Sequence, residues 1–176
     1  HRPPNPRRPL SGEAMTQMHP APASGWLIFT SFMVAFVLTI IPLPNDIEAF
    51  RPEWVVLAVI YWALAQPQSV GVGVAWVIGL VLDIVHGAVF GQHALGMIFV
   101  AYIVVYLHQR IRTYPLWQQL LSVLMLVILY KLLLLWIFGV IGRSIDVSLY
   151  WSSVLTSVLL WPWLSSLLRR RTAVQR

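Results

Sequence analysis

The chain has 176 residues, of which 59% are hydrophobic and only 10% are charged, against roughly a quarter charged in an ordinary soluble domain. A soluble protein this small could not hide so much apolar surface from water, so the composition indicates an integral membrane protein. The basic residues behind the net charge of +6 lie mainly in the tails and one short loop. This distribution is typical of the cytoplasmic segments of a membrane protein and predicts no nucleic-acid partner. The absence of cysteine excludes disulfides and thiolate chemistry.

The first 24 residues are rich in proline, arginine and small polar residues, which predicts a disordered cytoplasmic N-terminal tail. Met15 and Met18 are both candidate natural starts, so the residues before them need not be native. The tail has no long apolar run with a cleavage site and is not expected to be a secretory signal.

Six apolar segments follow, each bounded by prolines, glycines or polar residues. None alternates with a period of two, so a helical bundle is the architecture that satisfies its backbone in lipid. We expect residues 25–168 to form a six-transmembrane-helix membrane domain and residues 169–176 a basic cytoplasmic tail. The predicted spans are Trp26–Leu43, Trp54–Ala65, Val70–Val85, Leu95–Leu107, Trp117–Ile141 and Leu149–Leu168.

The second segment is short for a span, because the 14 residues between Pro52 and Pro67 make about 21 Å of helix. The alternative is a re-entrant hairpin formed with the third segment. The positive-inside bias favours the crossing, since losing one span would leave an arginine-rich end outside. With six spans and both termini cytoplasmic, the arginines inside are Arg2, Arg7, Arg8, Arg110, Arg112, Arg169, Arg170, Arg171 and Arg176.

Small or polar residues recur every four positions in and after the third segment, and at least the first four share one helical face. Such spacing lets another helix approach closely, which is how helices associate in lipid. We therefore predict a helix-packing face, made by Gly71, Ala75, Gly79, Asp83, Gly87 and Gly91.

Asp83 and Lys131, the only lysine, both lie inside predicted spans. Counted from the inner helix ends, they lie about 20 Å and about 23 Å up, at the same depth. A charge inside a span normally has a partner, so we hypothesise that the two side chains pair across the bundle. The alternatives are that Asp83 pairs with His86 one turn on, or that Lys131 extends outward to the membrane surface.

The sequence predicts no catalytic, cofactor or metal site. His86 and His93 could in principle bind a metal, but no third ligand is evident. Ser152, Ser153, Ser165 and Ser166 have no base arranged as in a triad, and Gly71-Val72-Gly73 lacks the rest of a phosphate-binding motif.

Several motifs in order resemble the rod shape-determining protein MreD family, in its Gram-negative form, over about Trp26 to Arg171. They are Arg51-Pro52-Glu53-Trp54, Tyr61-Trp62-Ala63-Leu64-Ala65-Gln66-Pro67, Gly79-x3-Asp83-x3-Gly87-x3-Gly91, Leu116-Trp117-Gln118-Gln119, Trp151-Ser152-Ser153 and Trp161-Pro162-Trp163. Two features depart from the family pattern: the proline- and arginine-rich head, and Lys131 within the fifth helix.

The resemblance implies a non-catalytic subunit of the bacterial inner membrane that supports lateral peptidoglycan synthesis and cell shape. Its implied partners are MreC directly and, through MreC, the MreB filament and the RodA–penicillin-binding-protein synthase. The resemblance also implies a fold similar to the substrate-binding subunits of energy-coupling-factor transporters.

The outer segment Leu43–Glu53 is a candidate partner contact, and Arg51, Pro52 and Trp54 are its motif residues. Exposed small-residue helix faces are a second candidate contact for a partner's span. The alternative function is a small-molecule-binding transporter subunit with a pocket near Asp83.

Overall fold

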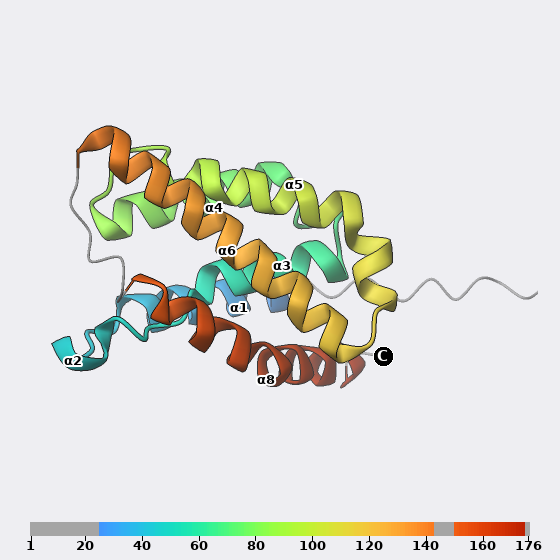
Figure 1. The fold of residues 1–176 in the computed structure, drawn as a ribbon. Helices are drawn as coiled ribbons and strands as arrows, with labels where there is room; N and C mark the ends of the chain where they lie inside the picture. Colours follow the sequence, from blue (N-terminus) through green and yellow to red (C-terminus); the bar gives the residue numbers. More distant parts are fainter. Residues whose placement is uncertain (1–24, 143–149, 175–176) are drawn as a thin grey trace, which may run out of the picture.

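The computed structural model describes residues 25–142 and 150–174. These residues are all helical outside the connecting loops, with six long helices and one of four residues. The helices are α1 (Gly25–Ile40), α2 (Asn45–Glu48), α3 (Trp54–Ala65), α4 (Val72–His86), α5 (Gln92–Thr113), α6 (Leu116–Ile141) and α8 (Ser152–Val174) (Figure 1). Each long helix overlaps one predicted segment, which confirms the all-α prediction for the described residues. The predicted tail 1–24 lies outside them.

Two helices extend several residues beyond their predicted segments. Helix α5 begins three residues before and ends six residues after the predicted Leu95–Leu107, because polar residues such as Arg110 continue a helix beyond its apolar stretch. Helix α8 continues past Leu168 to Val174, so most of the predicted basic tail is helical. Glycines end two helices: Gly87 after α4 and Gly142 after α6 adopt φ of +58° and +76°, in the left-handed region that favours glycine.

The short helix α3 lies at the centre of the molecule, in contact with α1, α5 and α8. All ten residues from Val55 to Leu64 are buried, and the indole N–H of Trp62 donates to Ser31 Oγ on α1 over 2.6 Å. Because protein surrounds α3, its 12 residues need not match the thickness of a bilayer. Its central position explains how so short an apolar helix can be accommodated.

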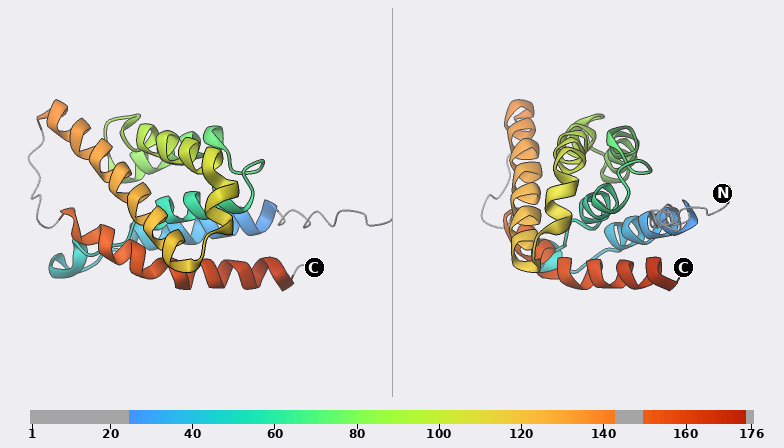
Figure 2. Two further views of the ribbon diagram at one scale, coloured as in Figure 1. Left: turned by 45° about the vertical axis from the view of Figure 1, so that its right-hand side comes forward. Right: turned by 90° about the vertical axis from the view of Figure 1, so that its right-hand side faces the viewer.

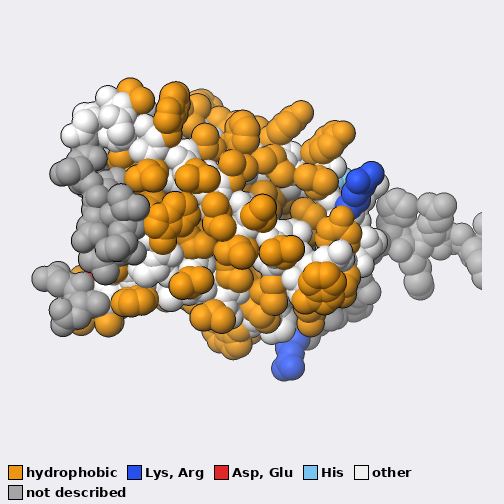
Figure 3. Space-filling model, in the orientation of Figure 1, with side chains coloured by type: hydrophobic (Ala, Val, Ile, Leu, Met, Phe, Trp, Pro, Cys, Tyr) orange, Lys and Arg blue, Asp and Glu red, His pale blue; other side chains and the backbone are white. Residues whose placement is uncertain are grey.

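The outer surface is apolar. Figure 3 shows hydrophobic side chains over most of one face, with basic side chains only towards one end of the described part of that face. Exposed aromatic residues include Trp26, Tyr106 and Trp136, each more than 70% exposed. An apolar surface of this extent marks contact with a membrane or another protein.

Two of the described helices, α5 and α6, are long and apolar enough to cross a bilayer by length and composition, and α1, α3 and α4 are shorter apolar helices. Helix α1 begins and helix α8 ends at the same end of the molecule (Figures 1 and 2). This arrangement is the one that an even number of crossings would produce.

Candidate functional site

Helices α4 and α5 form a closely packed hairpin. A Cβ atom built on Gly79 would lie 2.4 Å from the Cα atom of Ala94, closer than any real side chain can approach a backbone. Ala75, one turn before Gly79, is fully buried. The absence of a side chain at Gly79 therefore allows α5 to lie directly against α4 at this position.

Asp83 joins the two helices through its carboxylate, which is buried with a residue exposure of 1%. Its Oδ2 accepts the backbone N–H of Gly91 over 2.8 Å. Its Oδ1 accepts the backbone N–H of His93 over 2.7 Å and lies 2.8 Å from the Nδ1 of the same residue. The first N–H groups of α5 have no partners within their own helix, so Asp83 caps α5 from α4.

The two glycines after Asp83 shape the turn between these helices. Gly87 ends α4 in the left-handed region, and the N–H of Ala88 bonds to the carbonyl of Asp83 over 2.9 Å, as in a Schellman motif. Gly91 precedes α5 with φ of +96°. Neither glycine has a neighbour within 4 Å of an added Cβ. Their function is conformational, whereas Gly79 provides the close approach; Gly71 precedes α4 as its N-cap.

The hypothesised pair of Asp83 with Lys131 does not form. Asp83 pairs with His93, and Lys131 Nζ lies 2.5 Å from Glu53 Oε1. Both alternatives also differ from the structure, since His86 Nδ1 contacts the carbonyl of Leu82 and the Lys131 side chain is only 8% exposed. Asp83 and Lys131 were predicted to lie at the same depth in the membrane. The position of their helices around the bundle determines which side chain each one contacts.

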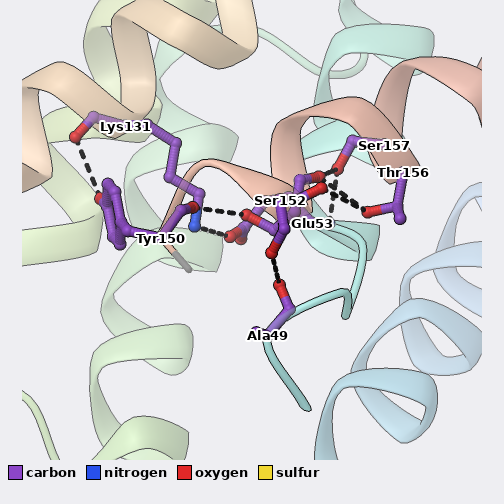
Figure 4. Close-up of polar contacts among 8 residues, drawn as sticks. Ala49, Glu53, Lys131, Tyr150, Ser152, Thr156 and Ser157 are labelled. Atoms are coloured by element: carbon purple, nitrogen blue, oxygen red, sulfur yellow. Dashed lines mark hydrogen bonds and ion pairs between the residues drawn. The ribbon is translucent and has the colours of Figure 1, made fainter. Parts of the chain in front are cut away.

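Lys131 belongs to a polar cluster between α6, the start of α3 and the start of α8 (Figure 4). Its Nζ lies 4.3 Å from the ring centroid of Tyr150, a cation–π distance, and the Tyr150 hydroxyl donates to the Lys131 carbonyl over 3.0 Å. The backbone N–H of Glu53 donates to Ser157 Oγ over 2.9 Å. The cluster therefore ties the start of α3 to two other helices.

Arg51 binds the end of α1. Its guanidinium donates to the carbonyl of Thr39 and, over 2.6 Å, to that of Ile41, and lies 2.8 Å from Glu48 Oε2. The last carbonyls of a helix have no partner within it, and a planar guanidinium can reach two at once. Among the described atoms, the buried Arg51 Nε has no hydrogen-bond partner.

A cavity of about 320 Å³ opens beside these residues. Its polar lining includes Glu48, Arg51, Glu53, His86, Lys131 and Tyr150, and Pro52, Trp54 and Leu82 add apolar surface. All three motif residues that were candidate partner contacts, Arg51, Pro52 and Trp54, thus line this cavity and are half-buried.

Sequence reasoning missed three participants. Glu53 stands in the Arg-Pro-Glu-Trp motif, and its position at the start of an apolar helix was a usable signal. His93 follows Gly91 by two residues, where a helix start needs an acceptor for its N–H groups. Gly96 was not singled out, although a Cβ there would lie 2.8 Å from the Tyr130 ring, so it allows α6 to pack on α5.

The rings of His86 and His93 stack with centroids 5.0 Å apart. Within residues 25–142 and 150–174, no group of three or more histidine, cysteine or carboxylate side chains could hold a metal ion. Both oxygens of the Asp83 carboxylate beside His93 accept backbone hydrogen bonds.

Comparison with known families identifies the chain. Residues 23–171 match the family of rod shape-determining protein MreD. The chain belongs to the MreD family. It is 35% identical over 146 residues to the rod shape-determining protein MreD of Haemophilus influenzae, an alignment that covers 81% of this chain and 88% of that protein. No solved structure matches the chain. Membership of the MreD family makes this a membrane protein with a role in determining rod shape, in accord with its apolar helices.

Proposed function

We propose that the chain is a non-catalytic, multi-pass subunit of the bacterial inner membrane that binds MreC within the cell-elongation complex. In this role it supports lateral peptidoglycan synthesis and, through MreC, associates with the MreB filament and the RodA–penicillin-binding-protein synthase. The observation that carries the proposal is the family match over residues 23–171, which spans every described helix except the last turn of α8.

The topology proposed for this role has six spans and both termini in the cytoplasm. Three observations support it: α1 begins and α8 ends at the same end of the molecule, Arg110 and Arg112 lie in the last turn of α5, and Arg169 and Arg170 lie late in α8. Basic residues favour the cytoplasmic side of a membrane. The packing face of α4 serves, in this proposal, to hold the bundle together.

The test is depletion of the protein in its rod-shaped host. Loss of a subunit needed for lateral wall synthesis should give rounded cells, and expression of the chain in trans should restore rods. Cells that stay rod-shaped after depletion would contradict the proposed role.

The proposed contact with MreC is tested separately by co-purification. Substitution of exposed apolar residues on one helix rim, such as Trp136→Ala on α6, should reduce the MreC recovered if that rim forms the contact. The double substitution Glu53→Gln/Lys131→Met, inside the bundle, is the comparison variant, because it removes both partners of the ion pair together. If the amount of MreC recovered stays the same after substitutions on every exposed rim, direct binding is contradicted.

The alternative, a ligand-binding transporter subunit, is favoured by one observation, the cavity beside α3. The charged lining of the cavity includes Glu53, Lys131 and Arg51, whereas the Asp83 carboxylate is engaged in capping α5. Similarity to the substrate-binding subunits of energy-coupling-factor transporters stays a prediction. Saturable uptake of a solute dependent on this chain would support the alternative.

A further inference from the structure

Charged groups of both signs line the cavity beside α3. Lys131 Nζ and Glu53 Oε1 lie 2.5 Å apart in its wall, and Arg51 is the second cation there. Lys131 stands ten residues before the end of α6 at Ile141, which corresponds to about 15 Å along the helix. The cavity therefore carries an ion pair well below the end of a helix long enough to span a bilayer.

Such an ion pair is poorly explained by stability alone. Moving two charges out of water is unfavourable, and replacing a buried pair by apolar residues of similar size is often neutral or stabilising. Charged residues inside spans commonly mark the place where a polar molecule is held. The lysine side chain is 8% exposed and the glutamate 22% exposed, so the carboxylate is the more open of the two charges.

The charges limit the class of molecule that could bind between them. A ligand with a single charge could bind one partner but would leave the other without its counter-ion in a confined site. A zwitterion can offer an anion to Lys131 and an ammonium to Glu53 at the same time.

We propose that this cavity binds a zwitterionic group in which an ammonium lies close to an oxyacid anion, inserted between Lys131 and Glu53. The cavity volume of about 320 Å³ falls in the range of small-ligand sites. Two sources supply this chemistry: the headgroup of an aminophospholipid, and a free amino acid or phosphoethanolamine. The proposal is independent of the role in cell shape.

The test uses the full-length protein purified in detergent. Thermal unfolding is followed with phosphoethanolamine, glycine, inorganic phosphate or ethanolamine at equal concentrations, and native mass spectrometry measures retained phosphatidylethanolamine against phosphatidylglycerol. We expect the zwitterions to raise the unfolding midpoint or phosphatidylethanolamine to be retained preferentially. Retention of the lipid alone assigns a lipid source, and a response to the soluble zwitterions assigns a free one. An equal response to phosphate and phosphoethanolamine, with no lipid preference, would overturn the proposal.

The matched variant is the double substitution Glu53→Gln/Lys131→Met, which removes both charges and leaves neither stranded. Affinity for the zwitterion should fall roughly tenfold or more, as expected when charge-assisted hydrogen bonds are lost. Arg110→Gln, which removes an exposed cation near the end of α5, should bind as the parent does. Unchanged binding by the double variant contradicts the proposal. If that variant does not fold, the ligand comparison on the parent protein decides alone.

Discussion

At the scale of single residues, the described structure assigns separate tasks to the two charges that the sequence placed at one depth. Asp83 accepts N–H groups at the start of α5, and Lys131 forms an ion pair with Glu53. Both oxygens of the buried Asp83 carboxylate accept backbone N–H groups, and Oδ1 also contacts the His93 ring. An amide at position 83 would present an NH2 group to N–H donors, at least one of which would lose its acceptor.

Asp83→Asn is therefore expected to lower the free energy of unfolding by about 1–3 kcal/mol, the cost of leaving a buried polar group unsatisfied. Thermal unfolding in detergent measures the change. Glu48→Gln is the matched control, because Glu48 is 49% exposed and forms one surface ion pair, for which the expected effect is under about 1 kcal/mol. Equal losses in the two variants would show that the Asp83 carboxylate does not act as a cap.

The pair of Glu53 and Lys131 is expected to behave non-additively. Lys131→Met alone leaves a carboxylate without its counter-ion and should destabilise by roughly 1–3 kcal/mol, below the 3–5 kcal/mol of fully buried pairs because Glu53 is 22% exposed. Adding Glu53→Gln should recover most of that loss. A double-mutant cycle of unfolding free energies measures the coupling, and additive effects would rule out an energetic pairing of the two side chains.

At the scale of helices, the hairpin of α4 and α5 is the closest contact in the described fold that depends on a small residue. Gly79 faces the backbone of Ala94, whereas Gly73 on the same helix is exposed with nothing within 4 Å of an added Cβ. Replacing glycine by alanine at these two positions therefore separates the effect on helix packing from the effect on helix propensity.

Gly79→Ala should destabilise the protein by about 1–3 kcal/mol or more, because its methyl group would force the two helices apart. Gly73→Ala should be neutral or stabilising by up to about 1 kcal/mol, since alanine favours a helix more than glycine does. The two unfolding midpoints give the comparison. If Gly79→Ala proves as stable as Gly73→Ala, the close approach of α5 is not needed for the fold.

At the scale of the whole molecule, the central place of α3 bears on the membrane topology. A helix buried by protein on every side can be short and still connect the two surfaces of the bundle. In the re-entrant alternative, the loop between α3 and α4 would be reached from the outer side of the membrane and not from the cytoplasm.

The crossing of the membrane by α3 can be tested with single cysteine substitutions, because the sequence has no cysteine of its own that would be labelled. In intact cells, a membrane-impermeant thiol reagent should label Glu48→Cys and Val89→Cys. It should label Gln68→Cys and Thr113→Cys only after the membrane is opened. Labelling of Gln68→Cys in intact cells would contradict the crossing by α3.

Much of the fold follows from the sequence alone. Apolar segments between prolines and glycines predict the long helices, since the helix is the local structure that satisfies a backbone in lipid. The spacing from Gly71 to Asp83 predicts a tight helix contact, and Gly79 lies directly against the backbone of Ala94. The family motifs identify the chain as a member of the MreD family.

The partners of the charged residues were decided only by the tertiary structure. The depth of Asp83 and Lys131 can be calculated from the sequence with the helical rise. The direction in which each side chain faces, and the helix that it contacts, depend on how α3, α4, α5 and α6 pack together. Glu53 and Lys131 are 78 positions apart, a separation over which sequence spacing carries no information about contact. Composition and periodicity therefore determined a membrane-type helical bundle, and the packing of its helices determined where its charges meet and where its cavity lies.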